Sequence, residues 1–255
     1  MRFQLDLTKE YGIVLEGGGA RGSYQIGAWK ALREAGIKIR GIAGASVGAL
    51  NGALICMDDL EKAEEIWENI RYSQVIDVDD DVIETVKKLD LKSLDLMKVA
   101  EDAKKILKDK GLDITPLKNL IESVVDEDKI RSSDRELYLT TYSVTDRELL
   151  VLNAKDIPDG EIGDMLLASA YFPAFRNDKL GGKRYLDGGG WNNVPINILL
   201  EHDYKDILVI RIYGLGYDSE RTTEIPEDVH VTHIAPRQDL GGILEFDRTR
   251  ARKNM

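Results

Sequence analysis

A serine between two glycines is the residue of this sequence best suited to nucleophilic chemistry. Ser46 stands in the pentapeptide Gly44-Ala-Ser-Val-Gly48, after one apolar run and before another. In a sharp turn from a strand into a helix, glycines at the outer positions prevent clashes and the serine hydroxyl is exposed at the helix N-terminus. The G-x-S-x-G pattern therefore predicts Ser46 as a nucleophile. The N–H group of Val47 would lie where it can help to hold an oxyanion.

A glycine-rich loop lies earlier in the chain, at Gly17-Gly-Gly-Ala-Arg-Gly22. Glycine permits backbone conformations in which several N–H groups point to one place, and the N-terminus of a following helix adds partial positive charge. Such a loop binds an anion, which is either a permanent phosphate or the transient oxyanion of acyl transfer. The candidate oxyanion residues are Gly17, Gly18, Gly19, Arg21 and Gly22.

The same loop also matches the dinucleotide-binding pattern G-x-G-x-x-G through Gly17, Gly19 and Gly22. That fold needs an acidic residue near the end of the second strand to bind the ribose hydroxyls. The expected second strand, at residues 37–43, contains no acidic residue. A P-loop would need a lysine where Ser23 stands. A nucleotide-binding module therefore remains only as an alternative of a different functional class.

A serine nucleophile needs a base, and an aspartate is the best candidate for this role. Asp187 ends an expected strand and is followed by Gly188 and Gly189, so its carboxylate could accept the serine proton directly. The alternative is an ordinary Asp-Gly turn. The histidines fit the role of base less well. One lies at an expected exposed helix end. The other two lie three apart on an expected strand, so they face opposite sides of it. The three are His202, His230 and His233.

The composition excludes several other functions. The chain has 255 residues, with 35 Lys and Arg against 46 Asp and Glu, and a net charge of −11. Such an acidic protein is repelled by nucleic acid and gains nothing from a generally anionic membrane surface. The single cysteine, Cys56, rules out an internal disulfide and a multi-cysteine zinc site. We expect neither a metal nor a cofactor.

The hydropathy pattern predicts no export signal and no transmembrane segment. Residues 1–10 lack the apolar core and the cleavage site of a signal peptide. The least polar long stretch, residues 42–57, contains three glycines and is shorter than a bilayer requires. We therefore expect a cytoplasmic protein, with peripheral contact to membranes or lipid aggregates as its only association with lipid surfaces.

Strand and helix patterns alternate along the first 70 residues, which is typical of an α/β fold with a largely parallel sheet. The expected strands are residues 12–16, 37–43, 136–143, 149–153, 183–186, 207–212 and 229–234, the third and fourth of them forming a hairpin. The expected helices are residues 23–35, 47–57, 58–70, 162–170 and 247–255.

A helical excursion without strands is expected near residues 77–130, where the pattern changes. Within it, residues 86–110 hold eight lysines against five acidic residues, a local charge of +3. These lysines are either a solvated face or a contact surface for acidic lipid headgroups.

The motifs together resemble one family, the patatin-like phospholipases. The glycine loop Gly17–Gly22, the G-x-S-x-G pentapeptide Gly44–Gly48 and the Asp-Gly-Gly motif Asp187–Gly189 occur in the family's order and rough spacing. The segment Ala168–Pro173 is similar to the family's alanine-serine stretch ahead of the aspartate. Asn193-Val-Pro195 is similar to its Asn-x-Pro element behind it. The similarity covers about residues 11–212.

The resemblance implies a three-layer sandwich with a mostly parallel sheet, formed by a single catalytic domain over residues 1–255. It also implies a Ser46–Asp187 dyad without histidine, an acyl-serine intermediate, and an oxyanion hole made by the amides of Gly18 and Gly19 together with Val47. Calcium is not needed in this scheme. The helix expected at the C-terminus stops where family members usually continue, so the resemblance also raises the possibility of a truncated chain.

The leading functional hypothesis is a serine lipid acyl hydrolase that cleaves carboxylic esters of phospholipids or related lipids. A soluble carboxylesterase or thioesterase on the same dyad is the alternative among enzymes. A nucleotide-binding module and a catalytically inactive lipid-binding relative are the alternatives from other classes.

Overall fold

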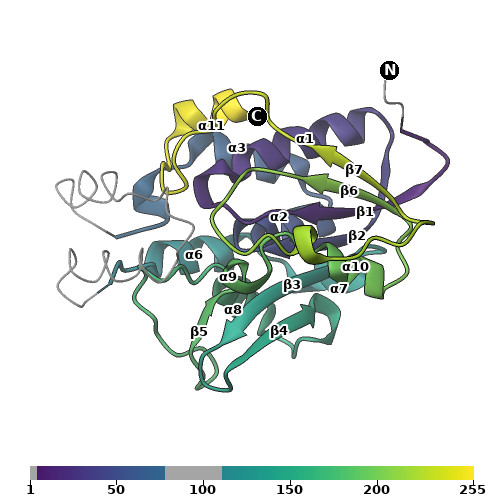
Figure 1. The fold of residues 1–255 in the computed structure, drawn as a ribbon. Helices are drawn as coiled ribbons and strands as arrows, with labels where there is room; N and C mark the ends of the chain where they lie inside the picture. Colours follow the sequence, from purple (N-terminus) through teal and green to yellow (C-terminus); the bar gives the residue numbers. More distant parts are fainter. Residues whose placement is uncertain (1–4, 78–110) are drawn as a thin grey trace.

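The computed structural model describes residues 5–77 and 111–255, in which helices flank a central β-sheet (Figure 1). The described residues form a seven-stranded sheet in which six strands follow the order β4-β3-β2-β1-β6-β7 and β5 pairs with β3. The strands are β1 (Glu10–Leu15), β2 (Lys38–Ala45), β3 (Glu136–Ser143), β4 (Glu148–Asn153), β5 (Tyr185–Asp187), β6 (Asp206–Ile210) and β7 (His230–Ile234).

Most strand pairs in this sheet are parallel. β1 runs parallel to both β2 and β6, β2 runs parallel to β3, and β6 runs parallel to β7. Only β4 and β5 are antiparallel to β3 among the described strands. The predicted α/β fold with a mostly parallel sheet is therefore confirmed.

Each face of the sheet has its own hydrophobic core, because successive residues of a strand point to opposite faces. On β1, Ile13 and Leu15 belong to the larger core and Val14 belongs to the smaller one. On β6, Leu208 and Val209 divide in the same way. Burial on both faces explains why these strands are continuous apolar runs in the sequence rather than alternating ones. The layers are helices, sheet and helices, as predicted.

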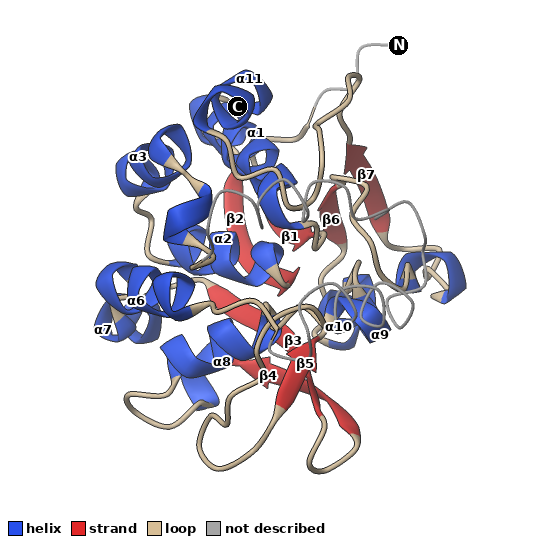
Figure 2. Cartoon of the chain, turned by 90° about the vertical axis from the view of Figure 1, so that its left-hand side faces the viewer, coloured by secondary structure: helices blue, strands red, loops and turns tan. Residues whose placement is uncertain are grey.

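Helices lie on opposite sides of the sheet (Figure 2). The larger core receives side chains from α1, α2, α3, α6, α7, α8 and α11, and the smaller core receives them from α10. The bounds are α1 (Ser23–Glu34), α2 (Val47–Cys56), α3 (Leu60–Asn69), α6 (Thr115–Val124), α7 (Glu127–Ser132), α8 (Ile162–Ser169), α9 (Gly189–Asn192), α10 (Ile196–Glu201) and α11 (Arg248–Asn254).

The predicted strands are all present and their ends differ by no more than two residues from the expected ones. Within the expected helical excursion, α6 and α7 are helical as predicted. The two ends of the described chain around this segment are joined by a hydrogen bond from the Asp77 N–H to the Asp113 carbonyl oxygen, over 2.8 Å. Residues 78–110, which include the lysine-rich segment, lie outside the described residues. Within the described ranges, no helix is long and apolar enough to span a bilayer.

Candidate active site

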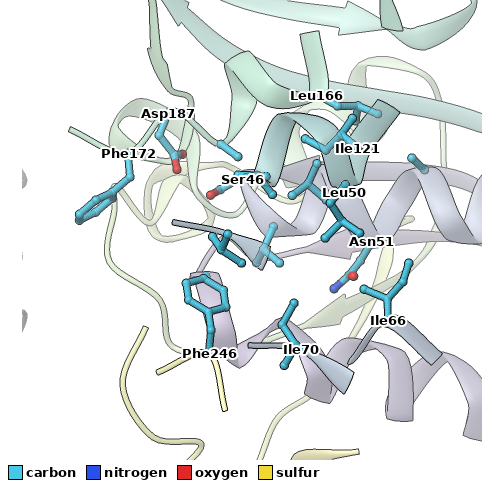
Figure 3. A pocket seen from close by; sticks show the side chains of 18 of the residues that line it. Ser46, Leu50, Asn51, Ile66, Ile70, Ile121, Leu166, Phe172, Asp187 and Phe246 are labelled. Atoms are coloured by element: carbon cyan, nitrogen blue, oxygen red, sulfur yellow. The ribbon is translucent and has the colours of Figure 1, made fainter. Parts of the chain in front are cut away.

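The sheet topology brings Ser46 and Asp187 together from distant parts of the chain. β2 pairs with β3 as far as Ala45, which lies opposite Thr140. β4 occupies the other edge of β3, so β5 continues along the β2 edge, and Asp187 lies opposite Thr141. The chain therefore leaves β2 at the point where β5 ends. The Ser46 hydroxyl and the Asp187 carboxylate face each other there (Figure 3).

The turn at Ser46 is strained, and this explains the glycines beside it. Ser46 has φ 55° and ψ −126°, a conformation that L-residues rarely adopt. A Cβ atom at Gly44 would lie 2.5 Å from the carbonyl carbon of Gly48, and one at Gly48 would overlap the carbonyl oxygen of Leu15. The turn can therefore form only with glycine at both positions, which is the physical content of the G-x-S-x-G pattern.

A second serine holds this turn in place. The Ser46 N–H donates to the Ser169 Oγ atom over 3.0 Å, and the Ser169 hydroxyl donates to the Thr140 carbonyl oxygen over 2.7 Å. Ser169 is fully buried in α8. No pattern in the sequence predicts a role for Ser169, although it lies in the alanine-serine stretch that resembles the family. Its two partners are backbone groups of residues distant in sequence, so no spacing in the sequence reveals these contacts.

Asp187 is almost completely buried, and its carboxylate has few partners. The Gly189 N–H donates to its Oδ1 atom over 2.8 Å, and the Ser46 hydroxyl faces the carboxylate and lowers its pKa. Burial raises the pKa of Asp187 from 3.8 to about 6, because these two interactions only partly compensate for the lost water. The group is therefore ionised at neutral pH and remains a usable base.

Close contacts also explain the two glycines of the Asp-Gly-Gly motif. A Cβ atom at Gly188 would overlap the Thr140 carbonyl oxygen, and one at Gly189 would overlap the Asn193 Oδ1 atom. The two glycines therefore allow the chain after β5 to pass close to β3 and to the Asn193 side chain, and this places the Gly189 N–H against the aspartate.

The glycine loop presents free backbone donors beside Ser46. Gly18, Gly19 and Val47 line the same pocket as Ser46, and their N–H groups donate no hydrogen bond to any residue in the described ranges. Gly19 has φ 55°, and a Cβ atom there would overlap the Ile243 carbonyl oxygen. Unpaired donors at one place can bind an oxyanion.

The other candidate loop residues lie behind this site. The Gly17 N–H donates to the Asn193 carbonyl oxygen over 3.2 Å, and the Gly22 carbonyl accepts from Asn51 over 2.9 Å. The Arg21 guanidinium donates to backbone carbonyls, so its charge is engaged outside the pocket. None of the three lines the pocket, in contrast to Gly18 and Gly19.

An apolar pocket extends from Ser46 and Asp187. Its empty volume is about 1110 Å³, part of which is open to solvent. Side chains of α2, α3, α6 and α8 line it together with Ile243, Leu244 and Phe246, and they are almost all aliphatic or aromatic. Ile66 lies on the side of the pocket away from Asp187 (Figure 3). The reactive groups therefore lie at one side of a cavity suited to an apolar chain.

Asn51 is a polar residue of the pocket wall, but its side chain is occupied. Its amide donates to the Gly22 carbonyl and to the Gln25 Oε1 atom, and its Oδ1 accepts from the Trp67 indole. The fixed amide orients α2, α1 and α3 around the pocket and offers no partner to a polar ligand.

The histidines and acidic groups suggest no other catalytic centre. His202 stacks on the Tyr138 ring at 4.3 Å, His233 contacts Glu220, and His230 is exposed at the start of β7. None of the three lines the pocket. The described residues contain no cluster of His, Cys, Asp and Glu that could hold a metal ion.

Known proteins and one family profile are similar to parts of this chain. The profile of the family described as "Patatin-like phospholipase" matches residues 13–200. A stretch of 50 residues is 58% identical to "Lysophospholipase nte1" of Aspergillus terreus, and one of 47 residues is 57% identical to "Neuropathy target esterase sws" of Drosophila sechellia. These stretches are 20% and 18% of this chain but only 3% of the length of either relative.

Among solved structures, VipD from Legionella pneumophila is similar with a TM-score of 0.49 and 19% identity, over 78% of this chain and 50% of that one. The family profile covers most of the sequence and includes all three motifs. The chain therefore belongs to the patatin-like phospholipase family, a family of lipid acyl hydrolases.

Proposed function

We propose that this protein is a serine lipid acyl hydrolase that cleaves carboxylic esters of phospholipids or related lipids through a Ser46–Asp187 dyad. The observation that carries this proposal is the apolar pocket that begins where a serine hydroxyl faces a buried carboxylate. Family membership supports the reaction class. The names of the similar proteins, a lysophospholipase and an esterase, also agree with it.

The reaction proceeds in two steps. Asp187 accepts the proton of Ser46 while the Ser46 Oγ atom attacks the ester carbonyl, and the N–H groups of Gly18, Gly19 and Val47 stabilise the oxyanion. Asp187 then donates the proton to the leaving alkoxide, so that the alcohol departs and the acyl group stays on the serine. Water, deprotonated by Asp187, attacks this acyl-serine. The bond between the acyl carbon and the Ser46 Oγ atom then breaks, Asp187 returns the proton to Oγ, and the fatty acid leaves.

Chain-length preference tests the choice between a lipid hydrolase and a soluble esterase. Long-chain esters should be cleaved with a higher kcat/KM than acetate or butyrate esters, because the pocket removes apolar chain from water at about 25 cal/mol per Å². Fatty-acid release from phospholipid vesicles and hydrolysis of short chromogenic esters measure the two activities. Faster turnover of the short soluble esters would favour the carboxylesterase or thioesterase alternative.

A tryptophan at Ile66 should obstruct the pocket without changing the reactive groups. We expect Ile66→Trp to lower kcat/KM for long-chain esters by about tenfold or more and to leave acetate esters nearly unaffected. The indole fills space that a long acyl chain would occupy, and each methylene left in water forfeits about 0.8 kcal/mol. Hydrolysis rates across a series of chain lengths measure this. Val151→Trp, at an exposed valine of β4, is the matched control and should behave as wild type. Equal loss on acetate would show that the site itself was damaged.

Histidine should not take part in the reaction. We expect His202→Ala, His230→Ala and His233→Ala each to retain most of the kcat of wild type, because none of these side chains lines the pocket. Steady-state kinetics on a long-chain ester test this. A loss beyond about a thousandfold in any one variant would restore a Ser–His–Asp triad as the mechanism.

The alternatives from other classes have weaker support. β2 ends in Gly44 and Ala45 and offers no carboxylate to a ribose, and the pocket beside the glycine loop is apolar. A catalytically inactive lipid-binding relative would share the pocket but not the turnover. The hydrolysis assay separates it from the enzyme.

A further inference from the structure

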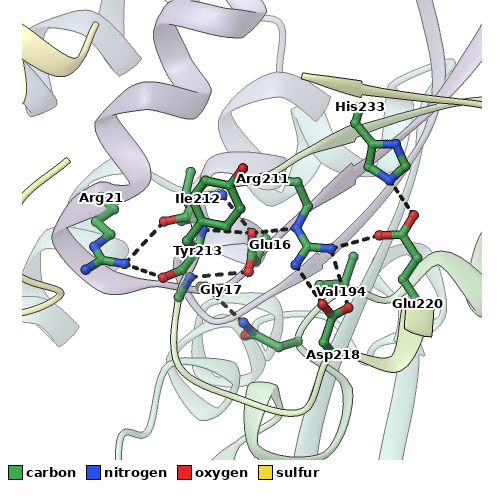
Figure 4. A network of polar contacts seen from close by, with 12 residues as sticks. Glu16, Gly17, Arg21, Val194, Arg211, Ile212, Tyr213, Asp218, Glu220 and His233 are labelled. Atoms are coloured by element: carbon green, nitrogen blue, oxygen red, sulfur yellow. Dashed lines mark hydrogen bonds and ion pairs between the residues drawn. The ribbon is translucent and has the colours of Figure 1, made fainter. Parts of the chain in front are cut away.

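Glu16 is a buried residue immediately before the glycine loop, and its carboxylate accepts four hydrogen bonds. Only 2% of the residue is exposed. It accepts the backbone N–H groups of Ile212, Tyr213 and Gly214 over 2.7, 3.0 and 3.2 Å, and the Arg211 Nε–H over 3.0 Å. Its carboxylate therefore holds four consecutive residues after β6 (Figure 4).

Arg21, on the other side of the loop, holds the same segment by its carbonyl groups. Its guanidinium donates to the carbonyl oxygens of Ile212 and Tyr213, and also to that of Gly241 over 2.7 Å. Tyr213 adopts φ 52°, a conformation that is unfavourable for tyrosine and needs such support. The N–H groups of residues 212–214 are thus fixed by Glu16, and the C=O groups of residues 212 and 213 are fixed by Arg21.

This segment lies directly against the peptide that carries an oxyanion donor. A Cβ atom on Gly214 would overlap the Gly17 carbonyl oxygen and would lie 2.7 Å from the Gly18 Cα atom. The Gly17 carbonyl also accepts from the Asn193 side chain over 3.1 Å. Because C=O and N–H point in opposite directions across a trans peptide, fixing the Gly17 carbonyl also fixes the direction of the Gly18 N–H.

We propose that Glu16, together with Arg21, is a positioning residue of the oxyanion hole: the two side chains clamp residues 212–214 so that Gly214 holds the Gly17–Gly18 peptide with its N–H toward the reacting carbonyl. Neither side chain touches the substrate. The proposal rests on the proposed function, since it assigns a purpose to the Gly18 amide in ester hydrolysis.

Glu16→Gln is the sharpest test, because it keeps the shape of the side chain but replaces one acceptor oxygen by a donor. The amide then opposes at least one of the N–H groups that the carboxylate accepts, and it leaves that buried donor unpaired. The matched control is Glu220→Gln. Glu220 binds the same arginine, with 2.8 Å to the Arg211 Nη1 atom, but makes no contact with residues 212–214.

Two ligands separate oxyanion stabilisation from filling of the pocket. A long-chain trifluoromethyl ketone forms a hemiketal with Ser46, whose oxygen needs the oxyanion donors, whereas a long-chain alcohol needs only the pocket. We expect Glu16→Gln to lower kcat and to weaken inhibition by the ketone, each by about 10- to 100-fold, and to change KM and inhibition by the alcohol by less than about threefold. Glu220→Gln should match wild type on all four quantities.

Three results would overturn the proposal: kcat and ketone inhibition unchanged in a folded Glu16→Gln variant, equal weakening of the ketone and the alcohol, or the same loss in Glu220→Gln. If Glu16→Gln shows no cooperative melting, Arg21→Lys takes its place. Arg21 binds the Gly241 carbonyl through Nε and the Ile212 and Tyr213 carbonyls through Nη1, and the single nitrogen of lysine cannot occupy both positions. A ketone-selective loss in Arg21→Lys therefore supports the clamp, and its absence contradicts it.

Failure of the clamp is distinguishable from failure of the proposed function. If wild type hydrolyses long-chain esters and Glu16→Gln does so equally well, only the clamp is wrong. If wild type is inactive and does not bind the ketone, the proposed function itself is wrong.

Discussion

Replacement of Ser46 by alanine should abolish ester hydrolysis, with a fall in kcat of about 10⁴-fold or more. The Ser46 hydroxyl is the group that would form the acyl intermediate, and no other side chain of the pocket wall can replace it: the polar ones are Asn51, Asp187 and Asn193, of which Asn51 is fully hydrogen-bonded. The variant should still fold, because alanine removes one oxygen atom and keeps the strained turn between Gly44 and Gly48.

Intact mass after treatment with a fluorophosphonate measures the same property without a choice of substrate. Wild type should gain the mass of one phosphonyl group, and Ser46→Ala should gain none. The matched control is Ser123→Ala, at an exposed serine of α6, which should be labelled and should turn over as wild type does. Labelling of Ser46→Ala would place the reactive serine elsewhere and remove the proposed mechanism.

The residues most open to prediction from the sequence are those at which the backbone leaves no freedom. Ser46 needs glycine at both flanks because a Cβ atom would meet Gly48 or Leu15, and Asp187 is followed by glycines because Thr140 and Asn193 lie close by. Such steric demands produce a fixed spacing, which a single sequence displays. The parallel sheet was equally accessible, since strands buried on both faces are continuous apolar runs.

The pocket and the clamp could not be predicted, because neither depends on a local pattern. Leu50, Ile66 and Ile121 are ordinary apolar residues of three helices, and only the packing of these helices leaves a cavity between them. Glu16 reads as the end of a strand, and its partner Arg211 lies 195 positions away. The position of Arg21 in the glycine loop predicts a charge at the oxyanion, whereas the side chain binds carbonyl groups outside the pocket. Contacts of this kind depend on the assembled sheet.

Replacement of Asp187 by asparagine should lower kcat by about 10⁴-fold, because the amide cannot accept the Ser46 proton. Wild-type kcat/KM should rise with pH and level off above about 6, the pKa to which burial raises Asp187, because only the ionised carboxylate acts as the base. The residual activity of Asp187→Asn should lack this pH limb. A pH–rate profile of both proteins tests this, and an unchanged limb in the variant would assign the titration to another group.

The same variant should be more stable than wild type at pH 8. The pKa of Asp187 is 3.8 unfolded and about 6 folded, so the folded state binds the proton more tightly, and stability falls as the pH rises from about 4 to above 6. The loss approaches about 3 kcal/mol at its upper limit. Asparagine carries no charge into the buried site and escapes this loss, so the difference in Tm should be positive at pH 8 and should shrink towards pH 4.

Thermal melts of wild type and Asp187→Asn between pH 4 and pH 8 measure this difference, with Asp134→Asn, at an exposed carboxylate, as the control. Higher stability together with lost turnover would mean that Asp187 is buried for its reactivity and not for the fold. Replacement of an aspartate that serves only as a turn residue would not raise stability while abolishing turnover. A lower Tm of Asp187→Asn at pH 8 would instead make the carboxylate a structural group, and its place in the dyad would then rest on the kinetics alone.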